Sequence, residues 1–119
     1  MKKILIVDDA VFMRLSIKNI LKDEEFEFFE AANGREAVQK YIEHRPDLVT
    51  MDITMPDMTG IEALKQIIDY DKNAMIMMIS AMGQESMVRE AIIAGAKTFI
   101  IKPFKEEQIL KTIKKLLAL

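Results

Sequence analysis

The sequence predicts an α/β fold in which five parallel strands alternate with five helices. Short apolar runs and longer stretches with helical spacing of apolar residues follow one another five times along the chain. Three of the apolar runs are nearly continuous, as expected of strands that helices cover on both faces. The connections are only a few residues long, which favours a single parallel sheet with right-handed crossovers.

The five predicted strands are the short apolar runs. We expect them at Ile4–Val7, Phe26–Glu30, Leu48–Met51, Ala74–Ile79 and Thr98–Ile101. The second run is mixed in character, whereas the first, third and fourth are almost entirely apolar. Proline marks two of the boundaries, because Pro46 stands just before the third run and Pro103 ends the fifth.

The five predicted helices are stretches in which apolar residues recur at intervals of three and four. The stripes are Met13, Ile17, Ile20 and Leu21; Ala37, Val38, Tyr41 and Ile42; Ile61, Leu64 and Ile68; Val88, Ala91 and Ile92; and Ile109, Ile113, Leu116 and Leu117. Asn33-Gly34 is expected to open the second helix, and Pro56 and Gly60 bracket the start of the third. Gly95 follows the fourth helix as a C-cap.

Composition excludes several kinds of chemistry. The chain has 119 residues, which fits one domain over residues 1–119 without a linker or repeat. It contains no Cys, so it has no disulfide, no thiolate zinc site and no Cys nucleophile. A Ser–His–Asp triad would have to be built around His44, the one His, which lies near a predicted helix end and is expected to be exposed without a chemical role.

Charge and hydropathy narrow the class of protein further. With 17 Lys+Arg and 19 Asp+Glu, the net charge of −2 argues against a nucleic-acid-binding module. No segment approaches the ~20 continuous apolar residues of a membrane span. The apolar run at the N-terminus is too short for a signal peptide, so we expect a cytoplasmic protein.

Polar residues follow four of the five predicted strands at the same edge of the sheet. Asp8 and Asp9 follow the first strand, Asp52 the third, Ser80 the fourth and Lys102 the fifth. Ligands of open α/β sheets bind outside the carboxyl ends of the strands, where the strand order reverses. The order 2-1-3-4-5, which is that of flavodoxin-like (βα)5 domains, puts this reversal between the first and third strands.

These residue types suit phosphoryl chemistry. Three carboxylates at one place repel one another unless they share a cation, and Mg²⁺ takes oxygen ligands while keeping several waters. A lysine and a hydroxyl beside such a metal can hold the oxygens of a phosphoryl group. One carboxylate can then act as nucleophile and form an aspartyl phosphate. The composition and the strand ends together point to phosphoryl transfer onto an aspartate.

Each of the polar residues that follow the predicted strands also has a plain structural explanation. Asp8 and Asp9 could cap the first helix, although capping accounts for one aspartate better than for two. Asp52 could be a turn residue, Ser80 an ordinary strand-end hydroxyl and Lys102 a solvated lysine. Their combination at one edge of the sheet favours a functional site.

The motifs, in this order and at these spacings, resemble those of response-regulator receiver domains. They are Asp8-Asp9, Asp52-Ile53-Thr54-Met55-Pro56 followed by Gly60, Ser80-Ala81 and Lys102-Pro103-Phe104. The resemblance covers nearly the whole chain, from Ile4 to the last helix. The residues after Asp9 and after Ser80 are similar to single-domain chemotaxis receivers of the CheY type in particular.

The resemblance implies a metal-dependent phosphorylation site. Asp52 would be the phosphoacceptor and would receive its phosphoryl group from a phosphohistidine on a kinase. Lys102 would pair with the phosphoryl oxygens. Asp9 and Asp52, with the backbone carbonyl of Thr54, would bind Mg²⁺, and Asp8 would bind it directly or through a water.

The resemblance also implies a switch. Ser80 would swing toward the phosphoryl group and Phe99 would repack inward behind it, although Phe99 lacks the hydroxyl of the Tyr that is common there. Met82 stands where relatives with short-lived phosphoryl groups are polar or acidic, and Thr54 where some have Asn. We therefore expect Met82 and Thr54 to influence the lifetime of the phosphoryl group, with Met82 shielding it from water.

The function that follows is a phosphorylation-controlled binding switch without an output domain. It would catalyse only its own phosphorylation and dephosphorylation, as a monomer. Its binding surface would comprise the helix at about 84–94, the fifth strand and the last helix. The implied partners are a histidine kinase of the CheA type, a flagellar motor switch or archaellum adaptor protein, and a dedicated phosphatase.

Three alternatives remain at this point. A phosphorelay intermediate, which passes the phosphoryl group to another His protein, would carry the same motifs. A Mg²⁺-dependent phosphatase of the haloacid-dehalogenase type needs a second Asp two residues after the nucleophile, where Thr54 stands, and a cap insertion that is missing. A flavodoxin needs a phosphate-binding loop after the first strand, where Asp8 and Asp9 would repel a phosphate.

Overall fold

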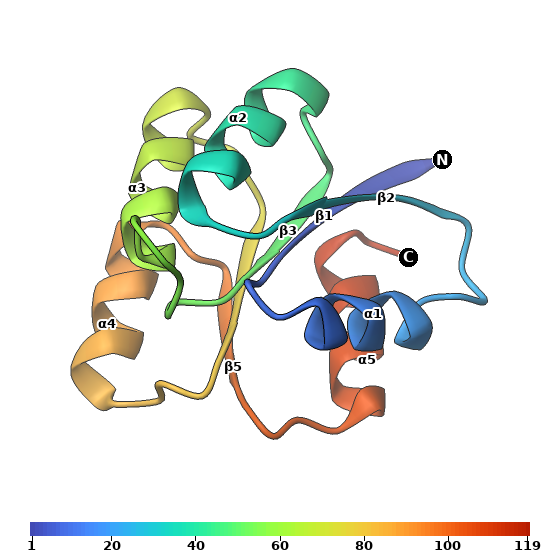
Figure 1. The fold of residues 1–119 in the computed structure, drawn as a ribbon. Coiled ribbons are helices and arrows are strands. Elements are labelled where there is room, and N and C mark those ends of the chain that lie inside the picture. Colours follow the sequence, from blue (N-terminus) through green and yellow to red (C-terminus); the bar gives the residue numbers. More distant parts are fainter.

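The computed structural model describes residues 1–119 and contains five strands and five helices in strict alternation (Figure 1). The strands are β1 (Lys2–Val7), β2 (Phe26–Ala31), β3 (Leu48–Met51), β4 (Ile76–Ser80) and β5 (Thr98–Ile101). The helices are α1 (Val11–Ile20), α2 (Gly34–His44), α3 (Gly60–Tyr70), α4 (Glu85–Ala94) and α5 (Glu106–Leu116). The predicted alternation is confirmed.

All five strands pair in parallel in one sheet, in the order β2-β1-β3-β4-β5. Helices α2, α3 and α4 cover one face of this sheet, and α1 and α5 cover the other (Figure 1). The strand order reverses between β1 and β3, so the carboxyl ends of these strands flank the crevice where ligands of such sheets bind. The flavodoxin-like fold and its strand order are therefore as expected.

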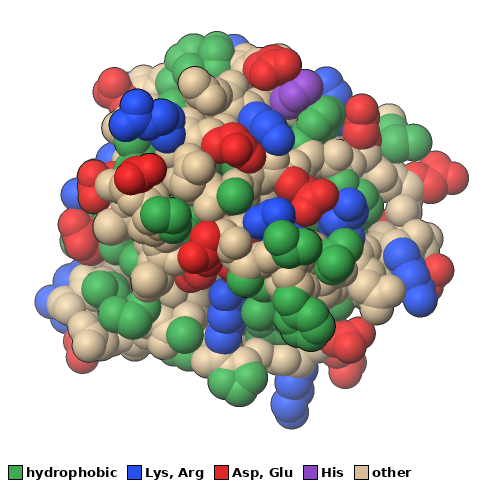
Figure 2. Space-filling model, viewed as in Figure 1, with side chains coloured by type: hydrophobic (Ala, Val, Ile, Leu, Met, Phe, Trp, Pro, Cys, Tyr) green, Lys and Arg blue, Asp and Glu red, His purple; other side chains and the backbone are tan.

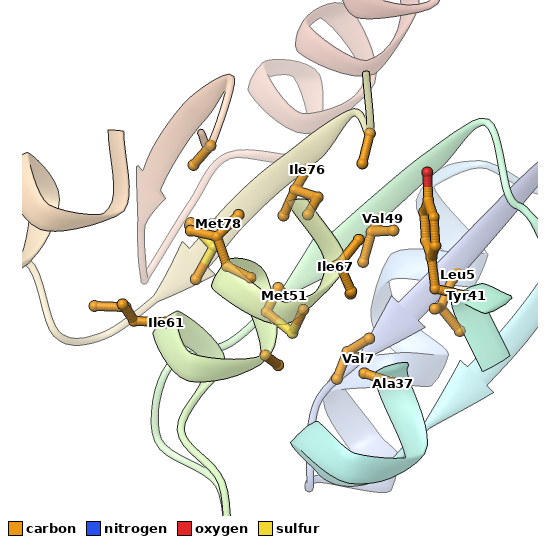
Figure 3. Packing of buried hydrophobic residues seen from close by; sticks show 14 of the residues in the cluster. Leu5, Val7, Ala37, Tyr41, Val49, Met51, Ile61, Ile67, Ile76 and Met78 are labelled. Carbon is orange, nitrogen blue, oxygen red and sulfur yellow. The ribbon is translucent and has the colours of Figure 1, made fainter. Parts of the chain in front are cut away.

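Each face of the sheet has its own apolar core. Figure 3 shows the cluster under α2, α3 and α4, in which Leu5 and Val7 of β1 pack with side chains of β3, β4 and these helices. The second cluster, under α1 and α5, receives Ile4 and Ile6. Successive side chains of a strand point to opposite faces, so every residue from Ile4 to Val7 is buried. This two-sided burial explains the continuous apolar run in the sequence.

The punctuation residues act mostly as predicted. Asn33 caps α2, because its side chain accepts a hydrogen bond of 2.8 Å from the amide of Glu36. Gly95 ends α4 with a φ of 120°, a conformation that glycine adopts without steric cost. The fourth strand, however, begins at Ile76 and not at Ala74, because the amide of Ala74 closes a turn with the carbonyl of Asp71.

The burial of three residues departs from the sequence pattern. Ile42 and Ile92 belong to the apolar stripes of their helices but are each 45% exposed. Each lies at the edge of its apolar stripe, which extends beyond the part of the helix that packs against the core. His44 is half-buried, not exposed, because its ring stacks on Phe29 with 3.9 Å between ring centroids.

The outer surface shows no broad area of one charge on the face in Figure 2, where acidic and basic side chains are interspersed. None of the helices combines the length and the apolar character that crossing a membrane requires.

Candidate metal centre

Three aspartates meet at the carboxyl edge of the sheet. One carboxylate oxygen from each of Asp8, Asp9 and Asp52 lies within 4.8 Å of the other two. Asp8 and Asp52 are only 3% and 8% exposed, whereas Asp9 is exposed. The cluster is therefore walled by protein around Asp8 and Asp52 and open to solvent at Asp9.

Asp8 is held by both of its carboxylate oxygens. Its Oδ1 accepts a hydrogen bond of 2.9 Å from the amide of Ala10, the N-cap residue of α1. Its Oδ2 lies 2.9 Å from the ammonium of Lys102. Asp8 thus fixes the turn just before α1, although α1 has no side-chain cap at its N-cap residue and no acidic residue in its first turn. The capping explanation leaves Asp9 unexplained.

Asp52 stands at the end of β3 with two different environments for its oxygens. Oδ1 accepts a hydrogen bond of 2.7 Å from the amide of Ile53, and Oδ2 lies 3.5 Å from Nζ of Lys102. Oδ2 therefore has the longer and weaker contact with the protein, and it faces the ammonium of Lys102.

Gly60 controls the loop that follows Asp52. A Cβ at Gly60 would lie 1.8 Å from the carbonyl oxygen of Asp52, far inside van der Waals contact. The amide of Gly60 also donates to the carbonyl of Ile53 over 2.8 Å. The sequence marked Gly60 as a boundary of the third helix and as part of the receiver motif, but a close approach between backbones leaves no local pattern.

The charge of this site suits a divalent cation. Three carboxylates and the Lys102 ammonium leave a net charge of −2, and Lys102 pairs with Asp8 and Asp52 but not with Asp9. Carboxylate oxygens, with an open side for water, are the ligands that Mg²⁺ prefers. Thr54 is exposed in the loop between β3 and α3, beside this cluster in sequence. The donor set therefore fits Mg²⁺.

Ser80 and Lys102 are joined through the backbone. Ser80 is fully buried at the end of β4, and its carbonyl accepts a hydrogen bond of 2.9 Å from the amide of Lys102. The hydroxyl of Ser80 accepts a hydrogen bond of 3.1 Å from the amide of Met82. In this state the hydroxyl is thus engaged with the loop after β4.

Phe99 and Met82 belong to the core on the α2, α3 and α4 face. Both are half-buried and pack against its apolar cluster, as does Met87. Phe99 lies in β5 opposite Met78 of β4. Phe99 is therefore part of the core, and the Lys102–Pro103 peptide bond that follows β5 is cis.

One group of residues at this site escaped the sequence analysis. Arg14 of α1 donates to the backbone carbonyl of Asp8 and to the carboxylate of Glu30 on β2, and Lys18 donates to the same carboxylate. Burial raises the pKa of Glu30, but the hydrogen bonds from Arg14 and Lys18 outweigh it and hold the pKa below its usual value. A basic residue on an amphipathic helix is ordinary, so no sequence signal marks this contact.

The largest hollow of the surface, of about 730 Å³, lies elsewhere. Its lining comes from the opposite edge of the sheet, where Lys2, Phe26 and Asp47 stand at or before the starts of β1, β2 and β3. It contains none of the strand-end residues. At the carboxyl edge, solvent reaches the cluster through the exposed Asp9.

Comparison with known proteins agrees with this arrangement. The model of the response regulator receiver domain family matches residues 4–114. The chemotaxis protein CheY of Bacillus subtilis is 61% identical over 116 residues, which cover 97% of both chains. CheY of Listeria monocytogenes is 58% identical over 116 residues, covering 97% of this chain and 98% of that one.

A solved structure shows the same fold at lower identity. It is the crystal structure of the CheX-CheY-BeF3-Mg complex from Borrelia burgdorferi, in which a chain 45% identical to this one superposes with a TM-score of 0.92. The match covers 97% of this chain and 88% of that chain. Because the family model spans nearly all of the sequence and two chemotaxis proteins share more than half of its residues, this chain belongs to the response-regulator receiver family, in its CheY-like chemotaxis branch.

Proposed function

We propose that this receiver accepts a phosphoryl group on Asp52 in a Mg²⁺-dependent reaction and then binds a downstream protein. The observation that carries the proposal is the position of Asp52, a nearly buried carboxylate with one oxygen facing Lys102 inside a cluster of three aspartates. The donor is the phosphohistidine of a kinase of the CheA type. The protein works in the cytoplasm as a monomer.

In the transfer step, Oδ2 of Asp52 attacks the phosphorus and the phosphorus–nitrogen bond of the donor breaks. The electron pair of that bond leaves with the imidazole, which takes up a proton. Lys102 holds the developing charge on the phosphoryl oxygens, since its ammonium already lies 3.5 Å from Oδ2. Asp9 and Asp52, the carbonyl of Thr54 and, directly or through water, Asp8 would hold Mg²⁺. When bound, the ion would neutralise charge on the carboxylates and the phosphoryl oxygens.

The acquired charge changes the contacts of Ser80. A phosphoryl group on Asp52 offers strong acceptor oxygens, to which the Ser80 hydroxyl can donate after it leaves the amide of Met82. Because Ser80 pairs with Ile101 of β5, movement of Ser80 reaches β5 directly. Phe99 then repacks into the space behind it. Ser80 and Phe99 together form the switch.

The surface that reports this change consists of α4, β5 and α5. Ile101 is 51% exposed, and a Cβ at Gly83 in the loop before α4 would lie 2.7 Å from its side chain. The loop that Ser80 leads into thus packs on an exposed apolar residue of this surface. The partner there is a flagellar motor switch or archaellum adaptor protein.

The phosphoryl group is removed by water, either unaided or with a dedicated phosphatase. The Borrelia burgdorferi relative, solved as a complex of CheX and CheY with BeF3 and Mg, supports a CheX-like protein as a partner of this chain. The similarity to two chemotaxis proteins favours this role over that of a phosphorelay intermediate.

Beryllium fluoride, an analogue of the phosphoryl group, tests the switch. When beryllium fluoride and Mg²⁺ are added, the amide signals of Asp52, Ser80 and Phe99 should change, as should those across α4, β5 and α5. The variant Asp52→Asn should show none of these changes, whereas Asp57→Asn, in the exposed loop after β3, should behave as the wild type. Changes confined to the residues around Asp52 would overturn the proposed coupling to the surface.

A further inference from the structure

The turn that carries Asp8 and Asp9 is tied to the edge of the sheet by one side chain. Nη1 of Arg14 donates to the backbone carbonyl of Asp8 over 2.6 Å, and its Nε donates to Oε1 of Glu30 over 2.9 Å. The Arg14 side chain is only 13% exposed. One planar guanidinium therefore links α1, the turn after β1 and the end of β2.

Every polar backbone and side-chain group of Asp8 is consequently engaged. Its amide donates to the carbonyl of Ala31 in β2, its two carboxylate oxygens accept from Ala10 and Lys102, and its carbonyl accepts from Arg14. Of these contacts, the Arg14 contact alone reaches the peptide group that joins Asp8 to Asp9. The orientation of that peptide group decides where the Asp9 carboxylate can lie.

The far end of the guanidinium is anchored as well. The second carboxylate oxygen of Glu30 accepts a hydrogen bond of 3.1 Å from Lys18, and the backbone carbonyl of Glu30 accepts from the ammonium of Lys40. Glu30 is thus fixed from α1 and from α2. A fixed carboxylate orients the guanidinium in its plane, which is the geometry that suits arginine and not lysine.

The contacts of Arg14 oppose the electrostatic repulsion within the aspartate cluster. The carboxylates of Asp8, Asp9 and Asp52 repel one another, and Asp9 is the exposed member that can relieve the repulsion by turning away into solvent. α1 offers little resistance of its own, because its N-cap residue, Ala10, has no side chain that caps the helix. A turn that is free to relax would have to be reordered whenever a cation binds.

The geometry points to Arg14 as a positioning residue for the divalent-cation site, holding the Asp8–Asp9 peptide so that the three carboxylates are arranged for Mg²⁺ before the ion arrives. The inference rests on the proposed function, because it takes these carboxylates as the ligands. Arg14 itself touches neither the ion nor the phosphoryl group. It acts through the backbone of Asp8 and through Glu30.

The test compares two variants, each of which removes one positively charged partner of the Glu30 carboxylate. Arg14→Gln loses the contact with Asp8, whereas Lys18→Gln loses only a contact with Glu30. The dissociation constant for Mg²⁺ alone is measured by calorimetry on the metal-free full chain, and stability by urea unfolding with chelator present. Amide spectra of the metal-free variants report the order of Asp9 and Ala10.

We expect Arg14→Gln to weaken Mg²⁺ binding by about tenfold, the lower end of the effect of residues that hold metal ligands in place. Loss of positive charge by itself would strengthen the binding of a cation, so a weakening has the opposite sign to a simple charge effect. Lys18→Gln should bind Mg²⁺ at least as tightly as the wild type. The amides of Asp9 and Ala10 should broaden or shift in Arg14→Gln and not in Lys18→Gln.

Equal affinity of Arg14→Gln and Lys18→Gln for Mg²⁺ would overturn the inference and leave the proposed function intact, provided that the wild type binds the ion. If the wild type does not bind Mg²⁺, both are overturned. Should Arg14→Gln fail to fold, Arg14→Lys carries the test, because it keeps the charge but cannot donate to Asp8 and Glu30 with one rigid fork. Affinity of Arg14→Lys equal to that of the wild type would then refute the positioning role.

Discussion

The ammonium of Lys102 lies 2.9 Å from the carboxylate of Asp8, closer than the 3.5 Å that separates it from Asp52. The lysine that is expected to act on the phosphoryl group is therefore held chiefly by a neighbouring carboxylate. Its positive charge should lower the affinity of the same cluster for a metal ion, whereas in the proposed transfer step it would stabilise the phosphoryl oxygens.

These two effects make Lys102→Met informative. Removal of the ammonium should tighten Mg²⁺ binding, because three carboxylates then face the ion without a competing cation. It should slow phosphorylation by a small phosphodonor by roughly 100-fold, the lower end of the loss when one charge-stabilising group is removed. Calorimetry and intact mass over time measure the two effects. Lys105→Met, which replaces an exposed lysine three residues on, is the control. A loss of both Mg²⁺ affinity and phosphorylation rate in Lys102→Met would contradict this account.

Met82 offers a test of the phosphoryl lifetime. Its amide holds the Ser80 hydroxyl and its side chain packs against the apolar core. Met82→Glu should speed the decay of the aspartyl phosphate by roughly tenfold, since a carboxylate there can orient the attacking water, although less well than a dedicated general base. Met82→Leu keeps an apolar side chain and should decay at the wild-type rate. An unchanged decay rate in Met82→Glu would show that shielding by Met82 is not what limits the attack of water.

The close approach of Gly60 to Asp52 predicts a difference between two glycines. In Gly60→Ala the new methyl group would meet backbone atoms of Asp52, so the loop after β3 must move, at a cost of roughly 3 kcal/mol in the free energy of unfolding. In Gly83→Ala the nearest atoms belong to the flexible end of Ile101, and the cost should stay below about 1 kcal/mol. Urea unfolding measures both. Equal losses would mean that the backbone contact at Asp52 is not specially restrictive.

Acid should weaken the contact between Arg14 and Glu30. The pKa of Glu30 is held below its usual value of 4.5 by hydrogen bonds from Arg14 and Lys18, which outweigh the effect of its burial. A carboxyl whose pKa is lower in the folded state stabilises the protein above its unfolded pKa, and this contribution disappears as the pH falls through the folded value. The wild type should therefore lose more stability than Glu30→Gln between about pH 5 and pH 3. Urea unfolding across that range measures the difference, and parallel curves would exclude a contribution from Glu30.

The fold was largely predictable because burial on both faces leaves a continuous pattern. Ile4 to Val7 are apolar without interruption since the sheet buries each of them, and the strand ends could be read from the polar residues that follow. Burial at the margins was less predictable, as Ile42 shows, because the width of an apolar stripe does not reveal how far the neighbouring element extends. The strand order itself came from known flavodoxin-like proteins and not from the residues.

The site was predictable where its residues stand directly after strands. Asp8, Asp9 and Asp52 do so, and the structure brings their carboxylates together. The contact of Arg14 with Glu30 joins residues 16 positions apart on different elements, and neither residue type is unusual in its place. Such contacts depend on how helices settle on the sheet, which local spacing does not encode.

Phosphorylation at Asp52 can be measured directly by the intact mass of the protein after incubation with a small phosphodonor. The wild type should gain the mass of one phosphoryl group in the presence of Mg²⁺ and none when a chelator removes the ion. Asp52→Asn should gain nothing, while Asp57→Asn should gain as much as the wild type. A phosphoryl group that still appears in Asp52→Asn, or its absence from the wild type, would contradict the assignment of Asp52 as the phosphoacceptor.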